Sequence, residues 1–164
     1  MPTALSIRRL SPADLPLMQG VLAVFADAFE DPTTYNGARP SDRYLERLLG
    51  SDTFIALAAT EGDEVIGGLA AYELRKFEQE RSEIYIYDLA VAAAHRRHGV
   101  ATALIRELQG IAAERGAYVI YVQADLTDPP AIALYTKLGV REDVLHFDLP
   151  PLALRQRDLG PGGF

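Results

Sequence analysis

Apolar residues along this chain recur with two periods, one of two residues and one near 3.6 residues, which are typical of strands and helices. Short runs rich in β-branched and aromatic side chains predict strands at residues 5–10, 53–60, 64–74, 83–91, 118–124 and 144–149. Apolar stripes at helical spacing predict helices at residues 12–29, 42–49, 102–115 and 129–138. Ser11, Ser41 and Asp128 are the expected N-caps of three of these helices.

The order of the predicted elements is strand, two helices, three strands, helix, strand, helix and strand. This order indicates an α+β (mixed α/β) chain. The adjacent residues Gly67 and Gly68 predict a bulge or close packing in their strand. We expect a single domain over residues 1–150, followed by a mobile Pro/Gly-rich tail at residues 151–164.

The strand at residues 83–91, the turn at residues 95–101 and the following helix form the most informative stretch. The turn, HRRHGVA, combines two arginines with Gly99, which allows a ligand to approach the backbone closely. Free amides at a helix start and the positive end of the helix dipole favour an anion, above all a phosphate. The stretch therefore predicts a pyrophosphate-binding loop, although its spacing fits neither G-x-x-x-x-G-K-[ST] nor G-x-G-x-x-G.

Charge and composition argue against some classes of function. With 16 Lys and Arg residues against 23 Asp and Glu residues, the net charge is −7, which argues against nucleic acid as the main partner and suits a cationic substrate. The chain has no cysteine, hence no disulfide or thiolate nucleophile. His95 and His98 lack a clear carboxylate partner, so we expect no metal. We see no signal-peptide pattern and no membrane-spanning apolar run, and we expect a cytoplasmic protein without membrane contact.

Two motifs resemble those of the GNAT N-acetyltransferases. Residues 96–101, RRHGVA, fit the pattern R/Q-x-x-G-x-G/A, and residues 131–139, AIALYTKLG, fit A-x-x-L-Y-x-x-x-G. The resemblance implies the GNAT fold, in which helices flank a central, mostly antiparallel sheet with splayed parallel strands. It also implies acetyl-CoA as the cosubstrate.

Further runs resemble the type I aminoglycoside 3-N-acetyltransferases, the gentamicin acetyltransferases. These runs lie at residues 53–59, 76–79, 81–91, 117–125 and 146–148. The implied reaction transfers an acetyl group from acetyl-CoA directly to the 3-amino group of an aminoglycoside such as gentamicin, in a ternary complex, and gives resistance. Two alternatives stay open: acetylation of polyamines or other small amines, and a non-catalytic acyl-CoA sensor. A homodimer also stays open.

The resemblance assigns binding of acetyl-CoA to backbone and loop residues. Backbone groups of Leu89, Ala90 and Val91 are expected to pair with the pantetheine arm. The remaining residues expected to bind acetyl-CoA are Arg96, Arg97, His98, Gly99, Val100, Ala101, Thr102, Asp128 and Ala131.

Tyr135 stands where the family has its general acid, which protonates the departing thiolate. The attacking amine is largely an ammonium at neutral pH, so a base is needed. Asp88 and Asp125 are the favoured candidates, because Asp88 directly precedes the Leu-Ala-Val segment and Asp125 ends the neighbouring strand. Strand alternation places Tyr85 and Tyr87 on the face opposite Asp88 unless a bulge intervenes, and no single base stands out.

A polycationic acceptor needs an acidic cleft with aromatic side chains that stack on its sugar rings. The residues expected to bind it are Glu30, Asp31, Tyr35, Glu83, Tyr85, Tyr87 and Asp148. For each carboxylate the alternative is an ordinary solvated surface group.

Overall fold

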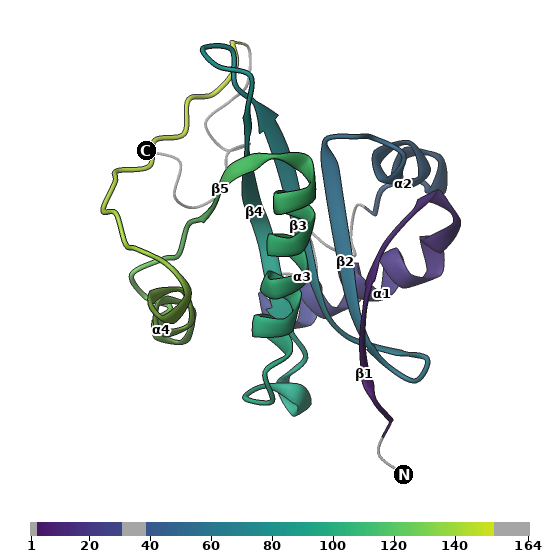
Figure 1. Ribbon diagram of the computed structural model, residues 1–164. Helices are drawn as coiled ribbons and strands as arrows, with labels where there is room; N and C mark the ends of the chain where they lie inside the picture. The colour runs from purple at the N-terminus through teal and green to yellow at the C-terminus, as the bar shows by residue number, and fades with distance from the viewer. Residues whose placement is uncertain (1–2, 31–38, 153–164) are drawn as a thin grey trace. The chain divides into compact units, whose positions relative to one another are not determined.

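The structure, a computed structural model, describes residues 3–30 and 39–152. The chain divides into two compact units, residues 1–124 and residues 125–164, and each is described by itself. The described part of the first unit contains a five-stranded sheet with α-helices (Figure 1). The helices are α1 (Leu15–Ala28), α2 (Asp42–Leu49) and α3 (Val100–Arg115), with the 3-10 turns η1 (Pro12–Asp14) and η3 (Ala93–His95).

The sheet has the strand order β1-β2-β3-β4-β5. Its strands are β1 (Leu5–Arg9), β2 (Phe54–Glu61), β3 (Glu64–Arg75), β4 (Ser82–Val91) and β5 (Ala117–Val122). The first three pairings are antiparallel, and β4 pairs with β5 in parallel because α3 forms the crossover between them. The predicted α+β architecture with a mostly antiparallel sheet is therefore confirmed.

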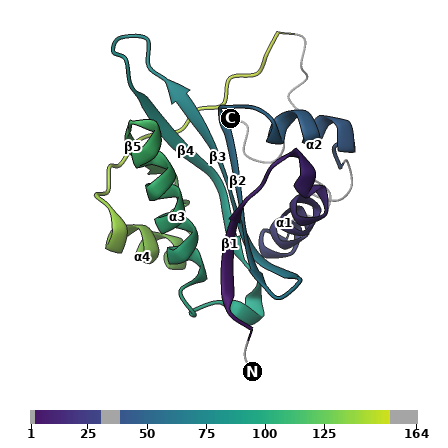
Figure 2. The ribbon, with the colours of Figure 1, turned by 45° about the vertical axis from the view of Figure 1, so that its right-hand side comes forward.

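Helices cover both faces of this sheet. Figure 2 shows α3 on one face and α1 with α2 on the other. The buried residues of α3 include the predicted apolar stripe, namely Leu104, Ile105, Leu108, Ile111 and Ala112. On the opposite face the core joins apolar residues of α1, α2 and the strands, among them Met18, Val21, Phe25, Leu45 and Phe54. The helical period of the sequence thus identified the correct face of α3.

Glycines allow α1 to approach β3 closely. A Cβ on Gly68 would lie 2.5 Å from Cγ1 of Val21. The pairing of β2 with β3 also shifts by one residue between Gly67 and Val65, which marks a bulge. Close packing and a bulge, the two alternatives that the glycine pair predicts, are therefore both present.

A second bulge, in β4, decides which side chains share a face of the sheet. The pairing of β4 with β3 shifts by one residue between Ile86 and Asp88, so Tyr87 is the extra residue. One extra residue reverses the alternation of the side chains that follow it. Asp88 consequently lies on the same face as Tyr85. That face is the one covered by α1, because Ala70, the partner of Asp88, belongs to the core beneath this helix.

The strands β4 and β5 pair over only part of their length. Their register runs from Ser82 opposite Ala117 to Ile86 opposite Val122, whereas β4 stays paired with β3 as far as Val91. Beyond Ile86 the outer edge of β4 therefore has no partner on β5. This divergence is the splay between parallel strands that the resemblance implies.

The second unit contains α4 (Pro129–Leu138), with Asp128 as its N-cap. The predicted strand at residues 144–149 is wrong, because these residues are irregular and exposed. A strand needs a partner for its backbone groups, and the described part of this unit offers no second strand. Of the predicted tail, Pro151 and Leu152 are described and the rest lies outside the described residues. The domain boundary at residue 150 stays a prediction.

Candidate active site

The turn between β4 and α3 contains two left-handed residues, Arg97 with φ 63° and Gly99 with φ 79°. A Cβ on Gly99 would meet no atom within 4 Å, so glycine suits this position through its conformation and not through crowding. Where a left-handed residue follows a right-handed one, successive backbone N–H groups point into the same concavity. Such a concavity binds anions. The space beside Gly99 leaves room for a phosphate.

The helix α3 begins at this turn, and Gly99 caps it without a side-chain hydrogen bond. The amide of Ala103 donates to the carbonyl of Gly99 at 3.0 Å, which closes the first turn. The preceding amides, those of Val100, Ala101 and Thr102, have no acceptor within the helix. Together with the helix dipole, these amides fit the pyrophosphate of a CoA molecule.

Side chains fasten the turn to the sheet. Nε of Arg96 donates to the carbonyl of Val91 at 3.1 Å, and Nδ1 of His95 lies 3.6 Å from the carboxylate of Glu61. Arg96 thus holds the turn against the end of β4, whereas Arg97 stays exposed beside the amides of α3.

The face of the sheet covered by α1 carries a row of tyrosines beside Asp88, which we call the tyrosine row: Tyr72, Tyr85, Tyr87 and Tyr121. Ring centroids lie 5.9 Å apart for Tyr72 and Tyr87, 5.8 Å for Tyr85 and Tyr87, and 4.7 Å for Tyr85 and Tyr121. The row crosses β3, β4 and β5. Tyr85 and Tyr87 share this face by the alternation of the strand, and the β4 bulge brings Asp88 to the same face.

Three phenols of the tyrosine row, those of Tyr72, Tyr85 and Tyr121, have a raised pKa. Burial raises the pKa of Tyr72, Tyr85 and Tyr121, and the carboxylate of Asp88 adds to this rise in pKa for Tyr72 and Tyr85. Asp88 shares a face of the sheet with both phenols, because its partner Ala70 lies two residues before Tyr72 on β3 and Tyr72 pairs with Tyr85. The hydroxyl of Tyr85 donates to Oε1 of Gln123 at 3.1 Å. Asp88 and the tyrosine row thus lie on the same face of the sheet.

Glu83, another residue predicted to bind the acceptor, is engaged by other side chains. Its carboxylate accepts from the hydroxyl of Tyr118 at 3.0 Å and lies 3.8 Å from Nζ of Lys76. Of the predicted acceptor-binding residues, the structure thus groups Tyr85 and Tyr87 with Asp88, and gives Glu83 local partners.

The predicted general acid lies in the second unit, on α4. Burial, with a smaller contribution from the carboxylate of Asp128, raises the pKa of the Tyr135 phenol to about 12. Asp128 also caps the helix, because its carboxylate accepts from the amide of Ala131 at 3.2 Å. The backbone carbonyl of Asp125 accepts from the amide of Asp128 at 3.0 Å, while the Asp125 side chain is exposed.

The remaining predicted acceptor-binding residues are Glu30, Asp31, Tyr35 and Asp148. The carboxylate of Asp148 lies 2.9 Å from Nε2 of His146 in the second unit. Glu30 follows α1 as an exposed residue with φ 52°. Asp31 and Tyr35 lie outside the described residues. The choice between Asp88 and Asp125 as the base stays a prediction, since they belong to separately described units.

Sequence reasoning missed Tyr72 and Tyr121 as neighbours of this site. Tyr72 stands opposite Tyr85 across β3 and β4, and Tyr121 stands opposite Tyr85 across β4 and β5. Both tyrosines lie within strands that the sequence predicted, at residues 64–74 and 118–124. The missing information was the register between strands, which a period of two does not define.

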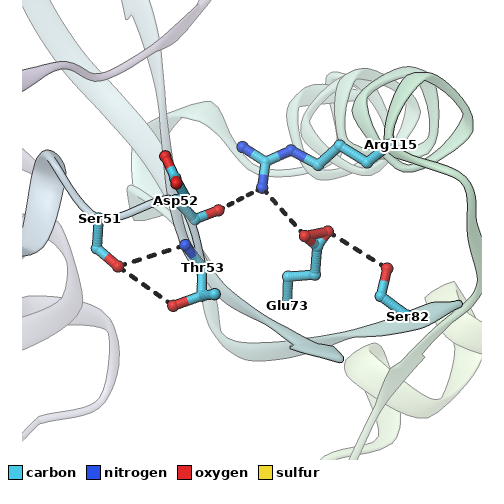
Figure 3. A network of polar contacts seen from close by, with 6 residues as sticks. All are labelled: Ser51, Asp52, Thr53, Glu73, Ser82 and Arg115. Carbon is cyan, nitrogen blue, oxygen red and sulfur yellow. Dashed lines mark hydrogen bonds and ion pairs between the residues drawn. The ribbon is translucent and has the colours of Figure 1, made fainter. Parts of the chain in front are cut away.

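A second polar cluster lies at the other end of α3 (Figure 3). Nη1 of Arg115 donates to the carbonyl of Asp52 at 2.6 Å and to the buried carboxylate of Glu73 at 3.4 Å. Glu73 also accepts from the hydroxyl of Ser82 at 3.3 Å. A depression of about 620 Å³ borders this cluster, but no residue of the β4–α3 turn lines it. The cluster therefore ties α3 to β3 and β4, and we do not place the active site there.

Two further observations apply to residues 3–30 and 39–152. In these ranges no three His, Asp or Glu side chains come together as a group that could hold a metal ion. None of the helices in them is both long enough and apolar enough to cross a bilayer. The candidate site in these ranges therefore consists of the turn before α3 and the face of the sheet that carries Asp88 and the tyrosine row.

Residues 22–140 match the model of the Acetyltransferase (GNAT) family. This range covers most of the chain and includes the turn before α3 as well as α4. The chain therefore belongs to the GNAT acetyltransferases, a family that uses acetyl-CoA. The family prediction from the two sequence motifs is confirmed, and the amides at the start of α3 fit the cosubstrate.

Two solved structures resemble the chain over nearly its whole length. One is the aminoglycoside acetyltransferase HMB0005 from an uncultured soil metagenomic sample, with 65% identity, a TM-score of 0.88, and coverage of 90% of this chain and 99% of that chain. The other is the aminoglycoside acetyltransferase meta-AAC0020, also from an uncultured soil metagenomic sample and in complex with sisomicin. Its identity is 31%, its TM-score is 0.84, and the coverage is 90% of this chain and 96% of that chain.

Curated relatives are longer than this chain. Streptothricin acetyltransferase of Streptomyces lavendulae is 31% identical over 128 residues, which are 78% of this chain and 59% of that protein. The match to N-acetyltransferase 8B of Rattus norvegicus is 26% identical and covers 54% of this chain and 40% of that protein. The chain thus spans about half the length of these two relatives.

Proposed function

We propose that this chain acetylates aminoglycosides, transferring the acetyl group of acetyl-CoA to the 3-amino group of an acceptor such as gentamicin and so giving resistance. The observation that carries the proposal is the 65% identity to a metagenomic aminoglycoside acetyltransferase over 99% of that protein. A less similar structure of the same fold, the aminoglycoside acetyltransferase meta-AAC0020, is in complex with sisomicin. The position of attack rests on the resemblance of residues 81–91 and 117–125 to the type I enzymes.

Acetyl-CoA is held at the splay and at the start of α3. The amides of Val100, Ala101 and Thr102 bind the pyrophosphate, and exposed Arg97 adds positive charge. The outer edge of β4 beyond Ile86 lacks a β5 partner, so its backbone groups pair with the pantetheine arm. Because the carbonyl of Val91 already accepts from Arg96, this pairing falls mainly to the backbone at residues 89–90.

Tyr135 acts as the general acid. Its phenol, with a pKa of about 12, is protonated at neutral pH and can therefore act as a proton donor. The phenol gives its proton to the sulfur while the C–S bond breaks, so that CoA leaves as the neutral thiol. Asp128 supports this role by capping the helix that carries Tyr135.

A carboxylate takes the proton that the attacking amine must lose. Asp88 and Asp125 are the candidates, and the geometry around Asp88 is the better defined of the two. The β4 bulge brings Asp88 to the face of the sheet that carries Tyr72 and Tyr85. With an amine held there, Asp88 removes a proton directly or through one water molecule.

The acceptor is a polycation. Asp88 and Glu83 give negative charge to the face of the sheet covered by α1, and Tyr85 with Tyr87 offers rings that stack on sugar faces. The net charge of −7 supports attraction of a cationic substrate. Glu30, Asp31, Tyr35 and Asp148 are proposed as further contacts.

The test is release of CoA thiol by the purified protein with acetyl-CoA and gentamicin, beside kanamycin, spermidine and no acceptor. Gentamicin-dependent release is the expected result, and NMR of the product should place the acetyl group on the 3-amino nitrogen. Turnover of spermidine without any aminoglycoside would replace the proposal with a polyamine acetyltransferase. Binding of acetyl-CoA with no turnover of any amine would indicate the sensor.

A further inference from the structure

The tyrosine row contains two members that are open to solvent. Tyr72 is 37% exposed and Tyr87 is 63% exposed, whereas Tyr85 and Tyr121 are half-buried. The rings of Tyr72 and Tyr87 stand nearly at right angles, with an interplanar angle of 87° and centroids 5.9 Å apart. These two rings therefore form two sides of a corner on the face of the sheet that carries Asp88.

Both rings of the corner pack against further aromatic side chains. The ring of Tyr72 packs against Phe54 with centroids 5.3 Å apart, and the ring of Tyr87 packs against Tyr85 at 5.8 Å. Tyr85 in turn stacks on Tyr121 at 4.7 Å. Because these contacts fix both rings, a ligand that enters the corner meets side chains that are already ordered, which lowers the entropic cost of binding.

The chemistry of the corner suits an ammonium group. A cation is attracted to the face of a tyrosine ring by the ring quadrupole, and pairs of aromatic side chains recognise ammonium ligands in this way. Asp88 follows Tyr87 on β4 and pairs with Ala70, two residues before Tyr72 on β3, so a carboxyl group lies on the same face as the two rings. A neutral sugar hydroxyl has no net charge, so it would be attracted less strongly to both the rings and the carboxylate.

We propose that Tyr72 and Tyr87 form a binding corner for one ammonium group of the acceptor, an assignment that rests on the proposed function. Tyr72 is thereby a specificity-determining residue that acts through its ring. It fixes the polycationic acceptor on the sheet while another group removes the proton from the attacking amine. The role concerns binding of the acceptor, so neither the chemical step nor the affinity for acetyl-CoA depends on it.

The test compares Tyr72→Leu with Tyr72→Phe in steady-state kinetics with gentamicin. The leucine variant loses the ring and should raise the KM for gentamicin roughly 5- to 30-fold, which corresponds to cation–π contacts of about 1–2 kcal/mol. The phenylalanine variant keeps the ring and should stay within about threefold of the wild type. In both variants kcat and the KM for acetyl-CoA should be nearly unchanged.

Two further variants complete the experiment. Phe77→Leu removes a fully exposed ring (100% exposed) from the β3–β4 turn, outside the tyrosine row, and should change nothing. Tyr87→Leu removes the more exposed wall of the corner, so it tests the same site if Tyr72→Leu folds poorly. Thermal unfolding of each variant is measured alongside, to separate loss of acceptor binding from loss of structure.

The outcomes separate the inference from the proposed function. An unchanged KM for gentamicin in both leucine variants would overturn the corner while leaving the aminoglycoside activity intact. A loss in Tyr72→Phe as large as in Tyr72→Leu would assign the effect to the hydroxyl and also overturn the inference. A wild-type protein that binds acetyl-CoA but does not turn over gentamicin would overturn the proposed function, and the corner with it.

Discussion

The phenol of Tyr135 has a pKa of about 12, which keeps the hydroxyl protonated far above neutral pH. Removing this hydroxyl in Tyr135→Phe should lower kcat by roughly 100-fold, the lower end of typical general-acid contributions. Binding of acetyl-CoA should be nearly unchanged, because the ring remains in place.

Stopped-flow or steady-state release of CoA thiol measures kcat, and calorimetry measures the affinity for acetyl-CoA. Tyr118→Phe is the matched control, since it removes a hydroxyl that donates to Glu83 at 3.0 Å and has no assigned role in proton transfer. An unchanged kcat in Tyr135→Phe would remove the phenol from the proposed reaction.

Gly99 offers a second test at the scale of single residues, because its left-handed backbone accepts Asn and Asp more readily than other side chains. Gly99→Asn adds bulk without charge, and Gly99→Asp adds nearly the same bulk with a negative charge. If the amides of α3 bind a pyrophosphate, the Asp variant should bind CoA at least about tenfold more weakly than the Asn variant.

Calorimetric titration with CoA gives both dissociation constants. The difference between the variants should shrink in high salt, because added ions screen the repulsion between the carboxylate introduced by Gly99→Asp and the phosphates. Equal affinities for CoA in the two variants would rule out an anion at this turn.

The packing of α1 on β3 is tested at the scale of elements. The Cβ of Gly68→Ala would lie 2.5 Å from Cγ1 of Val21, so the helix must shift, at a cost of about 1–3 kcal/mol of the free energy of unfolding. Gly110→Ala is the matched control within α3, since its Cβ would meet no atom within 4 Å. That control should stabilise the protein by about 0.5–1 kcal/mol.

Urea unfolding followed by circular dichroism measures both changes. Opposite signs for the two glycine variants are the expected result. A neutral Gly68→Ala would mean that α1 and β3 are less closely packed than the structure shows.

The cluster around Arg115 links the C-terminal end of α3 to Asp52 before β2 and to Glu73 on β3, and Glu73 in turn accepts from Ser82 on β4. Arg115→Met would leave the buried carboxylate of Glu73 without its cationic partner (Figure 3), which should cost about 1–3 kcal/mol of the free energy of unfolding. In a background of Glu73→Gln the same substitution should cost less, because no buried charge is then left unpaired.

A double-mutant cycle with urea unfolding measures this coupling. Additive effects would show that the ion pair between Arg115 and Glu73, at 3.4 Å, contributes nothing to the stability of the unit. The CoA affinity of the variants indicates in addition whether the end of α3 influences the turn at its start.

The charge of the whole molecule governs the encounter with a polycation. Since the net charge is −7, kcat/KM for gentamicin should fall severalfold as salt rises from about 50 to 500 mM, because ions screen long-range attraction. The measurement is CoA release at limiting gentamicin, with kcat at saturating gentamicin as the control. A kcat/KM that is independent of salt would contradict electrostatic attraction of the acceptor.

Local patterns predicted most elements because their physical causes lie within a few neighbouring residues. The stripe from Leu104 to Ala112 defined the buried face of α3, and Ser11, Ser41 and Asp128 are side-chain caps in the structure as predicted. The turn before α3 was also recognisable, because Gly99 is the residue that tolerates the left-handed backbone required there. The strand predicted at residues 144–149 failed, since a suitable pattern does not supply the pairing partner that a strand needs.

The sequence by itself determined the family, the buried face of α3 and the glycine turn at residues 95–101, because short-range periodicity and left-handed glycine are properties of local chain segments. Tertiary structure alone decided that Asp88 shares a face with Tyr85, and that Tyr72 and Tyr121 belong beside them. These relations depend on the bulge at Tyr87 and on the registers of three strands. A shift of one residue in any register would send these side chains to the opposite face of the sheet, and such registers are fixed by long-range packing.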